Sequence, residues 1–139
     1  MIGIVIVTHG QLGNALVDTA AIILGEPPKA VVPVSIDLTR DINTLRQKIQ
    51  DRIKQVDHNR GILILTDMFG GTPSNLSYSF LEEGRVEVIS GVNLPVLIKS
   101  VNLRSKGADL HDMAKTIEAY GKKSISLASD ILKGNKREA

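Results

Sequence analysis

The first ten residues, Met1-Ile2-Gly3-Ile4-Val5-Ile6-Val7-Thr8-His9-Gly10, decide the fold. Residues 2–7 are nearly all aliphatic, which is typical of a strand buried on both faces of a sheet. Directly after this strand, one face of a helical pattern is formed by Leu12, Ala15, Leu16, Ala20 and Ile23. Gly25 and the pair Pro27-Pro28 end the helix. A buried strand that leads straight into a helix indicates an α/β domain.

The same alternation continues along the chain. Further strands are predicted at residues 30–36, 61–66 and 86–89, with a short fifth strand from Ser124 to Ala128. Because Pro33 cannot donate a ladder hydrogen bond, the second strand should lie at a sheet edge. The pattern predicts a single three-layer domain at residues 1–130, with a mainly parallel sheet. The strand order is expected to be 2-1-3-4. A charged tail is expected at residues 131–139.

The helix boundaries are predicted from caps and glycines. Thr39 or Asp41 should cap the second helix. Thr72 should cap the third, with Pro73 at its first helical position and Gly84 marking its end. A fourth helix is expected over residues 94–103, and a fifth should begin near Leu110 and close at Gly121.

The composition excludes several classes of protein. The 139 residues contain no cysteine, which rules out disulfides, thiolate chemistry and Cys-ligated metals. The net charge is only +2 and aromatic residues make up 3%, so we expect no nucleic-acid binding. Neither a secretory leader nor a run of about 20 apolar residues is present, and we therefore expect a cytoplasmic protein.

Three unusual loops follow predicted strands. Thr8-His9-Gly10 comes after the first strand, residues 66–75 come after the third, and Ser90-Gly91-Val92-Asn93 comes after the fourth. In open α/β sheets, ligands bind beyond the carboxyl ends of the strands. If these strands are neighbours, the three loops converge on one shallow site.

The residue types in these loops suit phosphoryl chemistry. His9 can act as a nucleophile, and Asp67 lies where its carboxylate can orient one ring nitrogen and stabilise a charged ring. The backbone amides of Gly70, Gly71 and Thr72 precede a helix N-terminus, where anions are favoured. Taken singly, each residue has an ordinary structural explanation. Their joint occurrence at converging strand ends favours a catalytic site.

Other chemistries lack their motifs. The sequence has neither GxGxxG after the first strand nor GxxxxGK[ST], so binding of a dinucleotide and direct use of ATP are not predicted. His58 and His111 have no ligand spacing to each other or to His9 and are interpreted as surface residues. We expect no metal and no cofactor.

These motifs together resemble the IIA component of the mannose (mannose, fructose, sorbose) family of the phosphoenolpyruvate-dependent sugar phosphotransferase system. The resemblance extends from Ile4-Val5-Ile6-Val7-Thr8-His9-Gly10 to the last short strand. Its most specific parts are Thr66-Asp67-Met68-Phe69-Gly70-Gly71-Thr72-Pro73-Ser74-Asn75 and Gly91-Val92-Asn93-Leu94-Pro95.

The resemblance implies a phosphotransferase in which His9 takes a phosphoryl group from phospho-HPr and passes it to a IIB component. Asp67 corresponds to the orienting aspartate, which implies Nδ1 bound to Asp67 and phosphate on Nε2. Gly70, Gly71, Thr72 and Ser74 fall where the family shapes the phosphohistidine pocket.

The resemblance also implies partners and an assembly. It implies a homodimer in which the last strand pairs antiparallel with the partner's sheet. The IIB component is expected to be a separate protein, and the membrane IIC and IID components are indirect partners, so the chain would be peripheral to the membrane through the transporter complex. The sugar is not specified.

Two other functions are compatible with an early histidine in such a domain. One is the phosphocarrier subunit of a dihydroxyacetone kinase, which resembles this family but lacks the Gly-Gly-Thr-Pro run. The other is a regulatory protein, either a phosphoacceptor without a dedicated transporter or a module that merely binds an anion or a partner at this edge.

Overall fold

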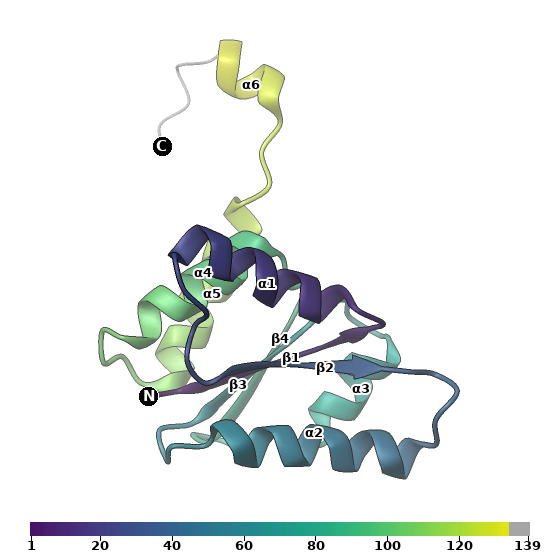
Figure 1. The fold of residues 1–139 in the computed structure, drawn as a ribbon. Coiled ribbons are helices and arrows are strands. Elements are labelled where there is room, and N and C mark those ends of the chain that lie inside the picture. The colour runs from purple at the N-terminus through teal and green to yellow at the C-terminus, as the bar shows by residue number, and fades with distance from the viewer. Residues whose placement is uncertain (134–139) are drawn as a thin grey trace.

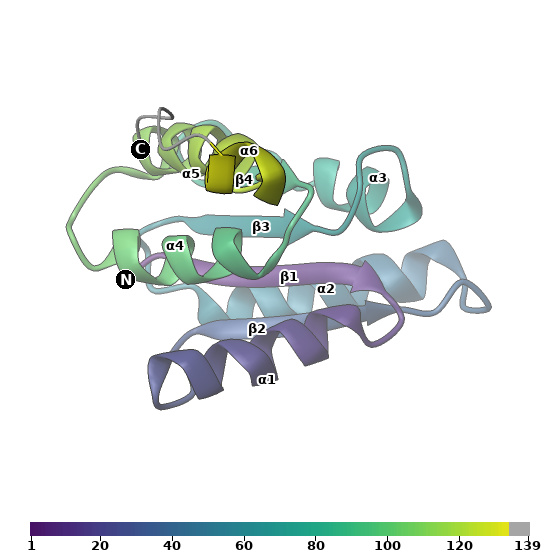
Figure 2. The same ribbon diagram turned by 90° about the horizontal axis from the view of Figure 1, so that it is seen from above.

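The computed structural model describes residues 1–133 and has three layers (Figure 1). A central sheet is covered by helices on both of its faces. Figure 2 shows three neighbouring strands of the sheet running in the same direction, and the fourth strand also pairs in parallel. The loops after the strands therefore lie at one end of the sheet. The three-layer α/β fold predicted from the sequence is confirmed.

The sheet is parallel throughout and has the order β2-β1-β3-β4. Its strands are β1 (Gly3–His9), β2 (Val31–Ile36), β3 (Ile62–Thr66) and β4 (Val86–Ser90). The first six residues of β1 and all five of β3 are buried, as expected for central strands. Pro33 lies in β2 at the sheet edge, as predicted.

One face of the sheet carries α1 (Leu12–Leu24), α4 (Leu94–Arg104) and α5 (Leu110–Lys123). Their apolar side chains pack on alternate residues of the central strands, including Ile4, Ile6, Leu63 and Leu65. The prediction that Gly121 ends the last of these helices is wrong, since α5 continues to Lys123. A β-carbon on Gly121 would lie 2.9 Å from Val96 Cγ2, so this glycine allows α4 and α5 to pack closely.

The other face carries α2 (Ile42–Val56) and α3 (Thr72–Tyr78). Asp41 caps α2 by accepting a hydrogen bond from the Thr44 amide, which settles the choice between Thr39 and Asp41. Gly71, rather than Thr72, is the residue before α3.

The predicted extent of α3 towards Gly84 is wrong. The Phe80 and Leu81 amides bond to carbonyls three residues back, and the Ser79 hydroxyl bonds to the Leu76 carbonyl. These local turn bonds compete with continuation of the helix.

The predicted fifth strand is absent from the described chain. Ser124 forms a bend, Ile125 to Leu127 pair with no strand, and α6 (Ala128–Lys133) begins where the strand should end. A short strand needs a partner edge, and the single chain folds no edge against this segment. None of the α6 residues is buried (Figure 1). Most of the predicted tail, residues 134–139, lies outside the described residues, and the domain boundary at residue 130 stays a prediction.

The amino end of the sheet is closed by a buried arginine. Arg104, at the end of α4, is 8% exposed, and its guanidinium donates to the carbonyls of Ile2, Lys29 and Ala30. These bonds join α4 to the start of β1 and to the loop before β2. Between residues 1 and 133, no helix has both the length and the apolar character needed to cross a membrane.

Candidate functional site

His9 and Asp67 meet at the carboxyl end of the sheet. His9 is the last residue of β1, and Asp67 follows the last residue of the neighbouring strand β3. Asp67 Oδ2 accepts two hydrogen bonds from His9, one from the backbone N–H at 2.9 Å and one from ring Nδ1 at 2.8 Å. One carboxylate oxygen thus fixes both the backbone and the ring of His9.

The contact with Asp67 determines which ring nitrogen of His9 carries the proton. Partial burial raises the pKa of the Asp67 carboxyl, but the hydrogen bonds from His9 outweigh burial and hold the pKa below its ordinary value of 3.8. Asp67 is therefore ionised at neutral pH and can only accept hydrogen bonds. Nδ1 of His9 must then carry the proton, which leaves the lone pair of a neutral ring on Nε2.

The Nε2 side of the ring faces the glycine loop and solvent. A β-carbon on Gly71 would lie 3.0 Å from His9 Cε1 and 3.5 Å from Nε2, so only glycine leaves this side of the ring uncrowded. The His9 side chain is 38% exposed, whereas that of Asp67 is 10% exposed. Asp67 therefore holds the ring from the protein interior, and the opposite side of the ring is accessible to solvent.

Two consecutive glycines, Gly70 and Gly71, form the loop beside the His9 ring. Gly70 has a φ of +88°, a conformation that favours glycine, and Gly71 is extended at the start of α3. No side chain caps the first turn of α3, in which Thr72 is the first residue. The first backbone amides of a helix without a side-chain cap suit an anion.

Ser74 is placed differently from the other predicted residues. It is completely buried, and its hydroxyl contacts Thr66 Oγ1 at 2.6 Å, Ser90 Oγ at 3.1 Å and the Met68 carbonyl. The side chain thus supports the loop from the interior. Direct contact of this hydroxyl with a group on His9 would require these bonds to open.

The third loop joins the site through β3. The amides of Gly91 and Val92 both donate to the Thr66 carbonyl at 2.9 Å. On the other side, the buried Thr8 hydroxyl accepts the Gly13 amide at 2.8 Å and ties the His9 turn to α1. The three loops therefore form one connected structure, as the adjacency of their strands predicted.

Sequence reasoning missed Thr8, Thr66, Ser90 and Tyr78. Each places a hydroxyl around the loops, and Tyr78 OH lies 3.0 Å from Ser90 Oγ. Three of them are the last or next-to-last residues of strands, which was the available signal. Hydroxyl residues at strand ends are common, however, and their convergence depends on tertiary packing.

The other histidines take no part in this site. His58 Nδ1 contacts the Val56 carbonyl at 3.1 Å, and His111 Nδ1 contacts Glu87 Oε2 at 2.7 Å on the exposed side of α5. Over residues 1–133, no group of three or more His, Asp and Glu side chains is suited to hold a metal ion.

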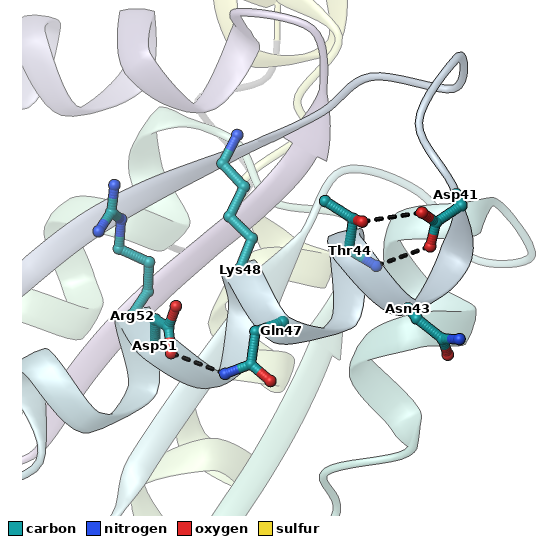
Figure 3. A pocket seen from close by; sticks show the side chains of 7 residues that line it. All are labelled: Asp41, Asn43, Thr44, Gln47, Lys48, Asp51 and Arg52. Carbon is teal, nitrogen blue, oxygen red and sulfur yellow. Dashed lines mark hydrogen bonds between the residues drawn. The ribbon is translucent and has the colours of Figure 1, made fainter.

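A hollow on α2 is a second candidate and has a simpler explanation. Figure 3 shows that its polar side chains come from one helix and its cap, with Gln47 bonded to Asp51 and Asp41 bonded to Thr44. Lys48 Nζ donates to the Ser35 carbonyl at 3.0 Å and so covers the outer edge of β2. These side chains satisfy one another and do not converge on a ligand.

The chain is similar to known proteins over most of its length. A family model for EIIA-man, described as "PTS system fructose IIA component", matches residues 3–118. The PTS system fructose-specific EIIA component of Bacillus subtilis (strain 168) is 33% identical over 133 residues, which is 95% of this chain and 90% of that protein.

A longer relative and a solved structure indicate the same family. The PTS system mannose-specific EIIAB component of Escherichia coli (strain K12) is 30% identical over 89% of this chain, which spans only 38% of that protein. A phosphotransferase system component EIIA from Streptococcus agalactiae superposes with a TM-score of 0.82 at 27% identity, over 93% of this chain and 98% of that one. The chain therefore belongs to the EIIA-man family of phosphotransferase-system IIA components.

Proposed function

We propose that this chain carries a phosphoryl group on Nε2 of His9, accepting it from phospho-HPr and handing it to a IIB component for sugar uptake and phosphorylation. Membership of the EIIA-man family supports the general role of a sugar phosphotransferase-system component. The main support for the proposal is the hydrogen bond between Asp67 and Nδ1 of His9, because it leaves Nε2 as the nucleophile.

The transfer step follows from the state of the ring. The Nε2 lone pair attacks phosphorus, a P–Nε2 bond forms, and the bond between phosphorus and the donor breaks with its electron pair returning to the donor. The phosphorylated ring keeps its Nδ1 proton and becomes cationic. The ionised Asp67, 2.8 Å away, stabilises that charge. Transfer to the acceptor reverses these steps.

The phosphoryl oxygens are held by the glycine loop in this proposal. The amides of Gly70, Gly71 and Thr72 supply preorganised donors at the Nε2 side, and the absence of a side chain at Gly71 gives the phosphoryl group room. Ser74 contributes through its place in the first turn of α3, while its buried hydroxyl holds the loop. The chain needs no nucleotide, metal or other cofactor for this step, because the donor is already activated.

The proposed partners place the chain in the cytoplasm, beside the membrane IIC and IID components that it meets through IIB. The similar mannose-specific protein is named an EIIAB component, and this chain spans only 38% of it. A name that joins IIA to IIB supports a IIB component as the acceptor. The sugar is handled by those partners.

Labelling tests the proposal. Incubation with phosphoenolpyruvate, enzyme I and HPr should give the chain an acid-labile, base-stable phosphate. His9→Ala should abolish this label, whereas the matched variant His111→Ala, which removes an exposed histidine elsewhere, should leave it unchanged. The proposal is wrong if the native chain gains no label or if His9→Ala acquires the same one.

We also propose a homodimer in which the segment from Ser124 to Ala128 pairs with β4 of the partner. β4 is an edge strand whose five residues are only half-buried, and a groove of about 630 Å³ runs between it and α5. Ile125 and Leu127 are 81% and 64% exposed in the single chain. Pairing would cover both the groove and these side chains.

Sedimentation equilibrium tests the dimer. Ile125→Asp should shift the native dimer towards monomer. Ile22→Asp on α1 replaces an isoleucine with the same 81% exposure and should leave the dimer intact. A monomeric native chain, or equal dissociation by both variants, would contradict the exchange.

A further inference from the structure

Four hydroxyl groups gather behind the glycine loop. Thr66 and Ser90 end the paired strands β3 and β4, and Ser74 and Tyr78 lie at the two ends of α3. The oxygen of Ser90 lies 2.9 Å from that of Thr66, 3.1 Å from that of Ser74 and 3.0 Å from that of Tyr78. Thr66 and Ser74 are completely buried. We refer to Thr66, Ser74, Ser90 and Tyr78 as the hydroxyl cluster.

Proton counting gives the cluster a direction. Each hydroxyl has one proton to donate and can accept two, whereas the Met68 carbonyl can only accept. Ser74 must therefore donate to the Met68 carbonyl. Thr66 lies 2.6 Å from Ser74 and 2.9 Å from Ser90, and its single proton can serve only one of these two contacts. Ser74 therefore accepts a hydrogen bond from Thr66 or from Ser90, and Ser90 can accept one from Tyr78. In either arrangement the chain of donors ends at the Met68 carbonyl.

Met68 connects the hydroxyl cluster to Asp67 and His9 by backbone hydrogen bonds. Its amide donates to Asp67 Oδ1 at 3.0 Å, so the peptide groups on its two sides are bonded to Asp67 and to Ser74. Asp67 holds Nδ1 of His9, and Gly71, three residues beyond Met68, packs against the Nε2 side. The Met68 carbonyl thus accepts a side-chain hydrogen bond from the Ser74 hydroxyl.

We propose that the hydroxyl cluster sets the position of residues 67–71 relative to the His9 ring, and that Ser74 is a positioning residue for phosphoryl transfer. The inference rests on the proposed transfer at Nε2. The Ser74 hydroxyl fixes the loop between the residue that orients the ring and the residue that borders the reacting nitrogen. Transfer is sensitive to such placement, because a shift of about 1 Å costs roughly 100-fold in rate.

The cluster has an outer end as well. Tyr78 and Ser90 line the groove beside β4, and the Phe69 ring lies 6.3 Å from that of Tyr78. Effects should therefore fall with distance from Met68. Loss of the Ser74 hydroxyl removes the bond to the carbonyl itself. Loss of the Ser90 hydroxyl removes one of the two groups that can donate to Ser74, and loss of the Tyr78 hydroxyl removes only the outermost donor.

The experiment compares Ser74→Ala, Ser90→Ala and Tyr78→Phe with a matched control. Ser77→Ala removes an equally buried hydroxyl from the same helix, one that donates to the Pro73 carbonyl at 2.7 Å and takes no part in the cluster. The full chain is used throughout. Three quantities are measured: the rate of phosphate transfer from phospho-HPr, the Tm, and the ¹⁵N shifts of the His9 ring and the Gly71 amide without phosphate.

Ser74→Ala should slow transfer about tenfold, Ser90→Ala about threefold and Tyr78→Phe less than about twofold, in line with the loss of single hydrogen bonds. Ser77→Ala should lower the Tm about as much as Ser74→Ala while leaving transfer within about twofold of native. The His9 and Gly71 shifts should move in Ser74→Ala and stay native in Ser77→Ala.

Equal transfer rates and equal shifts in Ser74→Ala and Ser77→Ala would overturn the inference. If Ser74→Ala does not fold, Ser90→Ala against Ser77→Ala gives the same decision. A native chain that gains no phosphate would refute the proposed function instead, and the ring and amide shifts would then decide whether the cluster positions the loop.

Discussion

The two ends of the sheet use charged side chains in opposite ways. At the amino end, Arg104 is 8% exposed, and its guanidinium is engaged by the carbonyls of Ile2, Lys29 and Ala30. At the carboxyl end, Asp67 engages only one of the two ring nitrogens of His9, whose side chain is 38% exposed. The first arrangement leaves little that can react, and the second leaves a lone pair beside a backbone loop. The difference separates a stabilising interaction from a site prepared for chemistry.

The largest effect should come from Asp67→Asn. An amide that donates to Nδ1 would favour the tautomer with its proton on Nε2, which removes the nucleophile. We expect transfer to slow by about 10³-fold, or about 4 kcal/mol, with the fold retained. Rapid-quench transfer from phospho-HPr measures it, and near-native rates would show that the Asp67 contact is only structural.

The contribution of the Asp67 carboxylate to stability should be lost at acidic pH. The pKa of Asp67 is lowered in the folded chain, so its contribution to stability is present above the ordinary value of 3.8 and is lost as the pH falls through the lower folded value. The difference in Tm between the native chain and Asp67→Asn should therefore shrink below about pH 4.

Arg104→Met should affect stability and leave chemistry alone. It keeps most of the side-chain volume but removes the guanidinium donor from the carbonyls of Ile2 and Lys29 and leaves Ala30 with the Ile4 amide alone, at a cost of about 3 kcal/mol in the free energy of unfolding. Urea unfolding measures this loss. Transfer at 25 °C should stay within about twofold of native, because the change lies at the opposite end of the sheet. A large loss of transfer in a folded variant would contradict the separation of the two ends.

Gly71→Ala should have a smaller effect, confined to the site. The extended backbone of Gly71 accepts alanine, but the added carbon would lie 3.0 Å from His9 Cε1. We expect transfer to slow about tenfold with little change in Tm. Gly70→Ala is the control, since its φ of +88° makes alanine strained while nothing lies within 4 Å. It should lower the Tm more and crowd the ring less.

The smallest effect on stability is expected from the ion pair of His111 and Glu87, which lies at neither end of the sheet. The hydrogen bond to Glu87 raises the pKa of His111 above its ordinary value of 6.5, so the pair stabilises the fold below that value and loses this effect as the pH rises through the raised folded value. Because the pair is exposed, His111→Gln should lower the Tm by only about 1 °C at pH 6 and by nothing measurable at pH 9. Scanning calorimetry at both pH values is the check.

Much of this arrangement was predictable from local sequence. The aliphatic run of β1 and the proline in β2 indicated the buried centre and one edge of the sheet, and the alternation of strands and helices indicated that the sheet is parallel. Parallel neighbours bring their carboxyl ends together, so the pairing of His9 with Asp67 followed from topology.

The features that failed or were missed depend on packing between distant segments. Gly121 has the sequence of a helix end, yet its role is close contact with Val96. The hydroxyl of Ser74 turns inward because Thr66, Ser90 and the Met68 carbonyl meet there. The segment from Ser124 to Ala128 has strand-like alternation but pairs with no strand of the described chain. No local pattern specifies such contacts.

The central claim is that the two ring nitrogens of His9 have different tasks, with Nδ1 held by Asp67 and Nε2 receiving the phosphoryl group. Long-range ¹H–¹⁵N and ³¹P–¹⁵N correlation spectra of the ¹⁵N-labelled, phosphorylated chain test it directly. We expect one phosphohistidine, with phosphorus coupled to Nε2 of His9 and the proton on Nδ1. Phosphorus on Nδ1, or on any residue other than His9, would contradict it.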